Sequence, residues 1–305
     1  MAAHPPDGHR RFMGGMLLLA ALLAACSSNS RQLLDRAEAN WRKGRYYEAI
    51  QDNESLYQME QRGRYAARAL LNLGNIYYLN LRQLKQAIEF YNRLTQEFPG
   101  REEALEAHRK LAGIYASPEF LDLDQAIVEY DKLLAARDLE DRADILFQRA
   151  DAYFKKGDYY RALRELRGLE DSGIRGHLAD QVSLKIGNIY QVQKKFADAV
   201  EPFRKVLTAT CQECRRSAIL NLAETYENLF AFDLAMETIG KLDRTPENEQ
   251  YIQSEIARLD DKQKRIDRGT GLQGNQPPPE RRTPAKQPAA RKRARVSKGR
   301  VPGAT

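Results

Sequence analysis

The sequence predicts an all-α fold in which about six helical hairpins stack into a solenoid. The first observation is the stretch from Arg149 to Leu169, where Gly157 and Asp158 separate two apolar stripes with helical spacing. The second is that this pattern recurs along the chain at a nearly constant interval. Because one hairpin cannot bury its apolar faces alone, it needs neighbours of the same kind.

Four columns of residues carry this repeat. In the first helix of each predicted hairpin a small residue is followed three positions later by tyrosine, or once by asparagine. In the second helix an alanine is followed seven positions later by leucine or valine. The steps between successive second-helix alanines are 38, 39, 36, 37 and 36 residues, a period typical of solenoids. The columns are Ala37, Gly74, Ala112, Ala150, Gly187, Ala223; Asn40, Tyr77, Tyr115, Tyr153, Tyr190, Tyr226; Ala49, Ala87, Ala126, Ala162, Ala199, Ala235; and Leu56, Leu94, Leu133, Leu169, Val206, Leu242.

These residues resemble the tetratricopeptide repeat (TPR), a family of two-helix units of about 34 residues. The match is closest over Ile186 to Tyr190 with Phe196, Ala199 and Phe203. The resemblance covers residues 33–246 and implies a TPR α-solenoid. The turns after Tyr77 and Tyr115 are one and two residues longer than the others, so we expect irregular curvature there.

Two different segments are expected after the solenoid. Residues 247–268 combine many charges with a thin apolar stripe, which predicts a capping helix over the last hairpin. Residues 269–305 are rich in Pro, Lys and Arg and contain almost no large apolar residues, which predicts a disordered tail. The positive charge of the chain is concentrated there: residues 276–305 carry nine Lys or Arg against one Glu, whereas the whole chain has a net charge of +7.

The first 25 residues have the features of a secretory signal: a basic start, an apolar run too short to span a bilayer, and small residues at its end. Leu23, Ala24, Ala25 and Cys26 resemble a bacterial lipobox. That resemblance implies cleavage before Cys26, lipidation of Cys26, and a flexible tether over residues 26–32. Ser27, rather than Asp, resembles the sequence of lipoproteins sorted to the outer membrane, so we expect a lipid-anchored protein on its periplasmic face.

No motif for catalysis is recognisable: there is no glycine-rich phosphate loop, no G-x-S-x-G and no H-E-x-x-H. His4 and His9 lie in the expected signal, and neither His108 nor His177 has metal-ligand spacing to another His or Cys. We therefore predict a non-enzymatic protein with no catalytic residues, no cofactor and no metal site.

Cys211 and Cys214 form the one motif that could carry chemistry, and they lie between the fifth and sixth predicted hairpins. In an oxidising compartment two cysteines with this spacing can form a disulfide. Thiol-redox activity and metal binding are the alternatives.

Stacked hairpins create a concave groove lined by their first helices, and such grooves hold peptide segments or partner helices. The tyrosine column is expected to pack in the core. The family pattern implies that the groove is lined by Leu71, Asn75, Tyr78, Arg109, Phe147, Asp151, Phe154, Leu184, Asn188, Gln191, Leu220 and Glu224.

The lipobox and the repeats together resemble periplasmic TPR lipoproteins. The stretch from Tyr91 to Tyr115 is similar to the repeat lipoprotein of the outer-membrane β-barrel assembly machine and to the Tol-Pal-associated repeat protein. The resemblance implies a membrane-anchored adaptor that binds envelope proteins or peptide segments in its groove. A pilotin or export-machinery assembly factor is an alternative. So is a cytosolic TPR regulator, if the signal is not processed.

The basic tail has three interpretations. An anionic lipid or an acidic partner could bind it, or it could serve only as a solubilising end. No nucleic acid is expected as a partner of a secreted lipoprotein.

Overall fold

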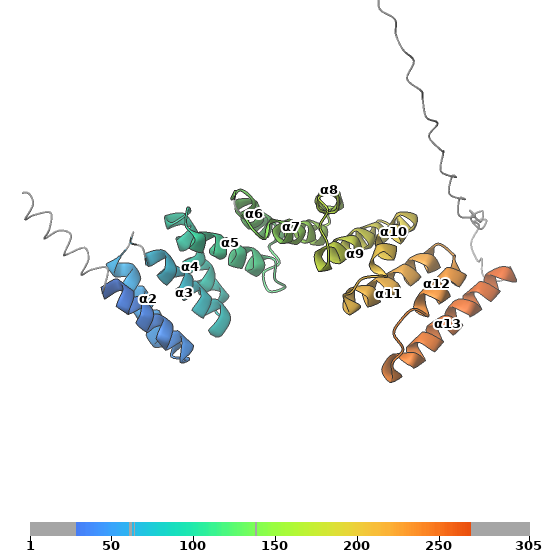
Figure 1. Cartoon of the computed structure of the whole chain (residues 1–305), viewed down its shortest axis with the longest axis horizontal. Coiled ribbons are helices and arrows are strands. Elements are labelled where there is room, and N and C mark those ends of the chain that lie inside the picture. Colours follow the sequence, from blue (N-terminus) through green and yellow to red (C-terminus); the bar gives the residue numbers. More distant parts are fainter. Residues whose placement is uncertain (1–28, 61–62, 64, 138, 270–305) are drawn as a thin grey trace, which may run out of the picture.

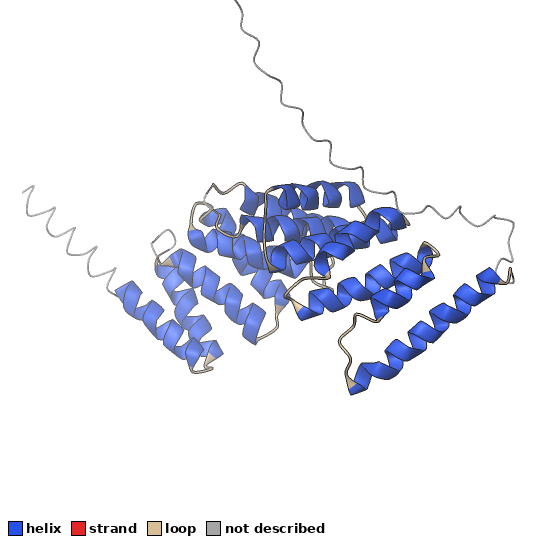
Figure 2. Ribbon diagram, turned by 45° about the vertical axis from the view of Figure 1, so that its right-hand side comes forward, coloured by secondary structure: helices blue, strands red, loops and turns tan. Residues whose placement is uncertain are grey.

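The structure is a computed structural model that describes residues 29–60, 63, 65–137 and 139–269. Within these residues the protein is all-helical and has no strand (Figure 2). The expected signal over residues 1–25, Cys26 and the tail from residue 270 lie outside the described residues. None of the described helices combines the length and the apolar character that a membrane span requires.

Six helical hairpins follow one another, as the sequence predicts, and a single long helix follows the last of them. The first hairpin pairs a helix over residues 29–42 with α2, and the later hairpins pair α3 with α4, α5 with α6, α7 with α8, α9 with α10, and α11 with α12. The helices are α2 (Tyr46–Met59), α3 (Ala66–Asn75), η1 (Ile76–Asn80), α4 (Leu84–Glu97), α5 (Glu102–Tyr115), α6 (Leu123–Leu134), α7 (Arg142–Lys156), α8 (Tyr159–Asp171), α9 (His177–Val192), α10 (Phe196–Val206), α11 (Gln212–Asn228), α12 (Phe232–Ile239) and α13 (Pro246–Asp267).

The hairpins form an elongated arch (Figure 1). In the view of Figure 1 the first helices α3, α5, α7 and α9 run along the underside of the arch, and their partners α4, α6, α8 and α10 lie above them. Each hairpin packs on the next one in sequence. The groove expected from stacked first helices therefore corresponds to the inner side of this arch.

Three of the four columns are buried: the small residues of the first helices, the alanines of the second helices, and the leucines and valine that follow them. All six second-helix alanines are fully buried, and the aliphatic residues seven positions later are at most 6% exposed. The small residues of the first helices are buried as well. The tyrosine-type column is buried or half-buried against the same clusters, as Tyr77 is where it stacks on Phe90. The register of the repeat is thus the register of the core.

Two glycines allow an unusually close approach inside a hairpin. Gly74 lies against the ring of Tyr91, and Gly187 lies against the ring of Phe203. A methyl group on either glycine would overlap that ring, because both rings are fully buried and packed on all sides. Glycine therefore permits the close approach of the aromatic ring in these two hairpins, whereas the third hairpin combines Ala112 with Tyr130 at the same positions.

The six turns inside the hairpins share two backbone features. Each contains a residue with positive φ, and the next residue donates a backbone hydrogen bond to the carbonyl of the tyrosine-type column, at 2.8–2.9 Å. This arrangement satisfies a carbonyl that the end of the first helix would otherwise leave unpaired. The positive-φ residues are Gly44, Arg82, Leu121, Gly157, Lys194 and Phe230.

The two longer turns are accommodated differently. After Tyr77 the extra residue is taken up by η1, a π-helical segment at the end of α3, in which Leu81 N–H bonds to Ile76 C=O. After Tyr115 the two extra residues form a looser turn, in which Phe120 packs edge-on against Tyr115. Both hairpins keep their columns buried, because each insertion is absorbed outside the helix crossing.

The first helix begins earlier than the sequence predicts. The lipobox resemblance implies a flexible tether over residues 26–32, but the described chain is helical from residue 29. Ser30 is fully buried, and the amide of Asn29 lies 3.9 Å from the sulfur of Met59. Contact with α2 extends this helix, although its first turn lacks the apolar spacing used to locate it.

Helix α13 closes the last hairpin, close to the expected range of 247–268. Thr245 and Asn248 form a reciprocal capping box, and Pro246 takes the first helical position, where its missing N–H is harmless. Ile252 and Leu259 are buried against the last hairpin, and the rest of the helix is mostly charged.

The first prediction concerns the close approach at Gly187. Gly187→Ala should destabilise the protein by about 1–3 kcal/mol, because the buried ring of Phe203 has to move. The measurement is the urea midpoint followed by helical circular dichroism. Gly113→Ala on α5 is the matched control: open space surrounds Gly113, so alanine there should leave stability unchanged or raise it by up to ~1 kcal/mol.

A second substitution tests the cause. The hairpin of α7 and α8 has Ala150 and Leu166 at the positions of Gly187 and Phe203, so Gly187→Ala combined with Phe203→Leu should recover part of the loss. Equal losses for Gly187→Ala and Gly113→Ala would contradict the proposed crossing geometry.

The second prediction concerns the attachment of α13. A hydrogen bond from Arg258 and the nearby charge of Lys262 lower the pKa of Glu227 on α11 from 4.5 to about 2. A carboxyl with a lowered pKa stabilises the fold above its ordinary pKa, and that contribution is lost as the pH falls through the folded-state value. Glu227→Gln should therefore cost roughly 1–2 kcal/mol at neutral pH after solvent screening, and nothing near pH 2.

Urea midpoints across this pH range, together with amide exchange in α13, provide the measurement. Glu237→Gln serves as the control, since the Glu237 carboxylate is exposed and pairs only with Lys241 on the adjoining turn. A pH-independent difference between wild type and Glu227→Gln would count against the ion pair.

Candidate functional site

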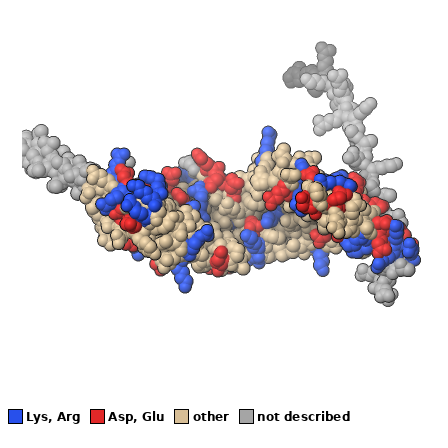
Figure 3. All heavy atoms as spheres, turned by 90° about the horizontal axis from the view of Figure 1, so that it is seen from below, with Lys and Arg blue, Asp and Glu red and all other residues tan. Residues whose placement is uncertain are grey.

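Most of the residues expected to line the groove are accessible on the first helices. Figure 3 views the molecule from below and shows Lys and Arg interspersed with Asp and Glu, with uncharged surface between them. The accessible members of the expected set are half-buried, except that Glu224 is exposed: Tyr78, Arg109, Phe147, Asp151, Phe154, Leu184, Asn188, Gln191, Leu220 and Glu224.

Leu71 and Asn75 were expected in the groove, but the structure places them in the core. Leu71 is 1% exposed, because α2, α4 and α5 all pack on α3. Asn75 is buried and accepts a hydrogen bond from the hydroxyl of Tyr91 at 2.7 Å. Burial also raises the pKa of this tyrosine hydroxyl, so Tyr91 remains a hydrogen-bond donor.

Arg109 is held at the junction of the third and fourth hairpins. Its guanidinium makes two hydrogen bonds, of 2.8 and 2.9 Å, to the carboxylate of Asp141, the residue before α7. The same guanidinium lowers the pKa of Asp141 by hydrogen bonding. Because the fork of Arg109 is engaged in this way, its charge is already neutralised on the surface.

Charge is also neutralised between α7 and α9. The ammonium of Lys185 lies 2.5 Å from the Asp151 carboxylate and 5.0 Å from the centre of the Phe154 ring. Lys155 pairs with the second oxygen of Asp151 at 3.0 Å. Burial raises the pKa of Asp151, but the hydrogen bonds and charges of the two lysines lower it by more. The pKa of Asp151 is therefore below its ordinary value. Asp151 is therefore ionised and paired at neutral pH.

Amide side chains connect α9 to α11. Asn221 donates to Asn188 Oδ1 at 2.9 Å. Gln191 donates to the backbone carbonyl of Asn221 and to the hydroxyl of Thr225, each at 2.9 Å. The first bond orients the neighbouring carboxamides of Asn188 and Asn221 relative to each other, and the other two bonds fix the carboxamide of Gln191.

Two polar atoms of this pair are unused. Within the described part of the chain, Asn188 Nδ2 has no acceptor and Asn221 Oδ1 has no donor. One free donor beside one free acceptor complements a peptide unit, which offers one carbonyl and one N–H. We refer to Asp151, Phe154, Lys185, Asn188 and Asn221 as the inner-surface cluster.

Sequence analysis missed Lys185 and Asn221. Lys185 follows Asp151 by 34 residues, and Asn221 follows Asn188 by 33 residues. Both separations are shorter than one repeat by about one helical turn. This separation could have identified both pairs from the sequence, because the solenoid places side chains with this separation on facing sides of successive first helices.

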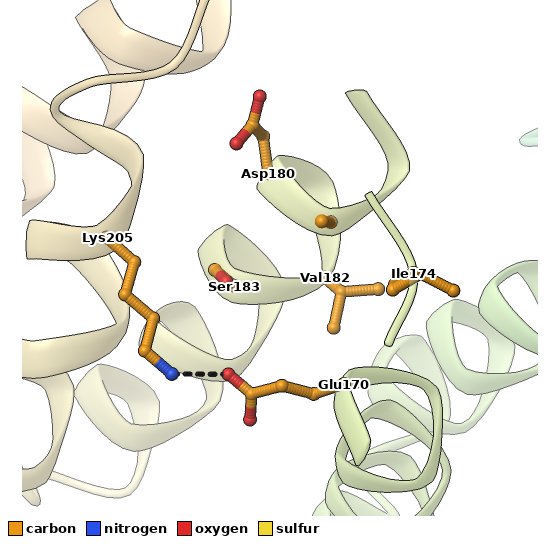
Figure 4. Close-up of a pocket in the computed structure, with 7 residues that line it drawn as sticks. Glu170, Ile174, Asp180, Val182, Ser183 and Lys205 are labelled. Atoms are coloured by element: carbon orange, nitrogen blue, oxygen red, sulfur yellow. Dashed lines mark hydrogen bonds and ion pairs between the residues drawn. The ribbon is translucent and has the colours of Figure 1, made fainter. Parts of the chain in front are cut away.

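The clearest cavity lies elsewhere, between the fourth and fifth hairpins. It measures about 250 Å³ and is lined by both apolar and charged groups, including Val182, Ser183 and Asp180 of α9 (Figure 4). Lys205 and Glu170 pair across one side of it at 2.6 Å. Small-molecule pockets usually enclose about 300–1,000 Å³ and are mostly apolar. This cavity therefore gives little support to a small-molecule site.

Cys211 and Cys214 form a disulfide at the start of α11. Cys211 is the N-cap, and its sulfur accepts a hydrogen bond from the backbone N–H of Cys214 at 3.1 Å. His177 Nδ1 lies 3.4 Å from Cys214 Sγ, although the sequence spacing gave no indication of such a neighbour. The two residues are 37 positions apart, which is one repeat.

His108, by contrast, has a structural role. It is buried, and its Nδ1 lies 2.5 Å from the carboxylate of Glu129, which Lys132 also contacts. Burial raises the pKa of Glu129, but the hydrogen bonds and charges of His108 and Lys132 lower it by more. The pKa of Glu129 is therefore below its ordinary value. This buried contact joins α5 to α6 within one hairpin.

Comparison with known families identifies the repeat. Residues 68–100, which cover most of α3 and all of η1 and α4, match a tetratricopeptide repeat model, and residues 147–213, which cover most of α7 to α10, match a second one. These two stretches are tetratricopeptide repeats. Proteins built from this repeat are generally non-enzymatic scaffolds that bind protein partners or peptides. No curated protein matches the sequence.

Several solved structures share the fold at low sequence identity. A tetratricopeptide repeat protein from Parabacteroides merdae aligns with a TM-score of 0.54 at 16% identity, over 81% of this chain and 94% of its own. PilW, a type IV pilus biogenesis factor, aligns with a TM-score of 0.51 at 14% identity, over 74% and 97%. PilF of Pseudomonas aeruginosa aligns with a TM-score of 0.50 at 10% identity, over 77% and 99%. These likenesses describe the fold.

Proposed function

We propose that this TPR protein is an adaptor of the bacterial cell envelope, and that it holds an extended segment of a partner protein against the inner-surface cluster. The observation that carries this proposal is the oriented pair of Asn188 and Asn221, with one free donor and one free acceptor. A carboxamide pair of this kind binds peptide backbone whatever the side chains of the peptide are.

The surroundings favour a peptide over a strongly charged ligand. Asp151 is paired with Lys185, so the cluster offers no large uncompensated charge. The half-buried side chains of Phe154, Leu184 and Leu220 provide apolar surface for alternate side chains of a bound strand. Backbone recognition combined with apolar contacts suits an adaptor that docks a short segment of a larger partner.

The proposed anchor is the lipid on Cys26. Leu23, Ala24 and Ala25 precede Cys26 as in a lipobox, and the solenoid starts only a few residues later. Several acyl chains, each contributing about 0.8 kcal/mol per buried CH₂, would hold the protein at the bilayer for long periods. The arch would then present its inner surface to periplasmic proteins near the outer membrane. The basic segment from residue 276 would add attraction to anionic lipid or to an acidic partner.

Assembly of a type IV pilus is the second candidate function. One of the solved structures that share this fold, PilW, is titled a type IV pilus biogenesis factor. An outer-membrane lipid anchor suits a protein that helps other envelope components to assemble. The partner found at the inner-surface cluster would distinguish pilus assembly from β-barrel assembly or Tol-Pal function.

The third prediction locates the partner. A photo-crosslinking amino acid at position 188 should capture a partner polypeptide in intact envelopes, because Asn188 lies beside the proposed peptide path. The same amino acid at position 160 is the control: Tyr160 is 77% exposed on the outer helix α8 and should give little product. Mass spectrometry of the adduct identifies both the partner and the crosslinked segment.

An affinity measurement tests the amide pair itself. Asn188→Ala with Asn221→Ala should weaken binding of the identified segment by about tenfold, because two hydrogen bonds of about 0.5–1.5 kcal/mol each are lost. Asn228→Ala on the same helix should have little effect, since Asn228 bonds only to the carbonyl of Glu224. Equal crosslinking from positions 160 and 188, or full affinity of the double variant, would rule out the inner-surface cluster as the binding site.

The fourth prediction concerns membrane attachment. Cys26→Ala should remove fatty-acid labelling and move the protein from the membrane fraction to the soluble fraction, because the lipobox would no longer contain a thiol to acylate. Cys211→Ala with Cys214→Ala should leave both properties unchanged. Wild-type protein that carries no label and keeps an uncleaved N-terminus would instead support a cytosolic TPR regulator.

A further inference from the structure

We propose that the reduced form of Cys211 and Cys214, together with His177, binds one thiophilic d¹⁰ cation, Zn²⁺ or Cu⁺, at the junction of α9 and α11. The three donor atoms come from two successive first helices and lie within 4.8 Å of one another. Thiolate and imidazole are the donors that these cations prefer. This site is independent of peptide binding, since none of its donors belongs to the inner-surface cluster.

The spacing of the donors fits direct coordination. Zinc bonds of about 2.3 Å to sulfur and about 2.0 Å to nitrogen, at a tetrahedral angle, place the two donors about 3.5 Å apart. The observed separation of Cys214 Sγ and His177 Nδ1 is 3.4 Å. The C-x-x-C spacing of the two cysteines is itself common among zinc ligands. Once their mutual bond is reduced, the two sulfur atoms have to move apart to about 3.8 Å, and Cys211 Sγ, now within 4.8 Å of His177 Nδ1, has to lie about 3.5 Å from it.

The two cysteines lie at the N-terminal end of α11. Cys211 is half-buried at the N-terminus of a 17-residue helix, where the helix dipole and the N–H of Cys214 both stabilise negative charge. Cys214 is 6% exposed and is backed by Val206, Ala209 and Ala218. Because His177 is exposed and Cys211 is half-buried, the fourth coordination position is open to water or to a ligand from a partner.

The two states of the site are separated by a balanced redox step. A dithiol reductant donates two electrons and two protons, so the Cys211–Cys214 bond breaks, two thiols form, and the reductant becomes a disulfide. Binding of the cation then releases the two thiol protons, while His177 coordinates through its neutral Nδ1. The oxidised site, as the structure shows it, retains the imidazole but no thiolate. The oxidation state of the pair thus decides whether the cation binds.

A bound cation would crosslink two hairpins. His177 begins α9 of the fifth hairpin and Cys214 lies in the first turn of α11 of the sixth, so coordination ties the two first helices together at their N-terminal ends. A ligand that binds only the folded protein stabilises it by an amount that grows with the logarithm of the ratio of free ligand concentration to the dissociation constant. The reduced protein should therefore gain thermal stability when Zn²⁺ or Cu⁺ is added.

The fifth prediction is tested with the full chain carrying Cys26→Ala, so that Cys211 and Cys214 are its only thiols. The protein is reduced with a dithiol, freed of it without oxygen, and titrated separately with Zn²⁺ and with Cu⁺ against a chromophoric chelator. We expect one equivalent bound by the reduced form and none by the oxidised form. The arm with the tighter binding identifies the preferred cation, and Co²⁺ should give a thiolate charge-transfer band in the reduced protein.

His177→Gln is the deciding variant, because it keeps both cysteines and changes only an exposed side chain. Its affinity should fall on the order of 100-fold, given that losing even an outer-sphere partner of a metal ligand costs about 10–100-fold. Asp180→Asn, one turn further along α9, should bind as the unmodified chain does. Unchanged affinity in His177→Gln would overturn the three-donor site. So would reduced protein that binds no more tightly than Cys211→Ser with Cys214→Ser, or that gains no thermal stability with either ion.

Discussion

The close crossing of two helices inside each hairpin is the constraint on which the rest of the structure depends. It requires alanine on the second helix and alanine or glycine on the first, because only small side chains let the backbones approach closely enough for the flanking leucines and rings to be buried. The limit is sharpest at Gly74 and Gly187, where an aromatic ring occupies the space of a methyl group. If the crossing widens, the hairpin loses the flat sides on which its neighbours stack. The arch, its inner surface and the junction at Cys214 all follow from this one repeated contact.

The sequence was sufficient to predict the fold, because each column is repeated six times and single exceptions such as Asn40 do not hide it. It was less informative where a feature occurs once. The first helix begins at residue 29, earlier than predicted, since packing on α2 extends a turn that lacks apolar spacing. The insertion after Tyr77 was recognised, but a π-helical segment was not, because sequence spacing reports how many residues are inserted and not which hydrogen bonds absorb them.

The candidate site was only partly predictable, for a reason tied to the geometry of stacking. Family pattern placed Leu71 in the groove, whereas α5 packs over it. Contacts between hairpins depend on the rise and twist from one unit to the next, which a single-repeat pattern does not contain. Asn221 and Asn188 meet at an offset of 33 residues, and His177 meets Cys214 at an offset of 37. Searching for complementary polar residues one period apart, within a helical turn, would have found both pairs.

The uniform turns, each closed by one backbone bond to the tyrosine-type column, also bear on how the protein responds to mechanical load. Within the described residues the main contacts of each hairpin are with its immediate neighbours. If the proposed lipid anchor and bound partner pull on the two ends of the arch, the tension would be carried by the junctions in series. In such an array the extensions of the individual junctions between hairpins add up, and the junction with the fewest bonds opens first. The crosslink proposed between α9 and α11 would stiffen one joint only, and would shift the strain to the others.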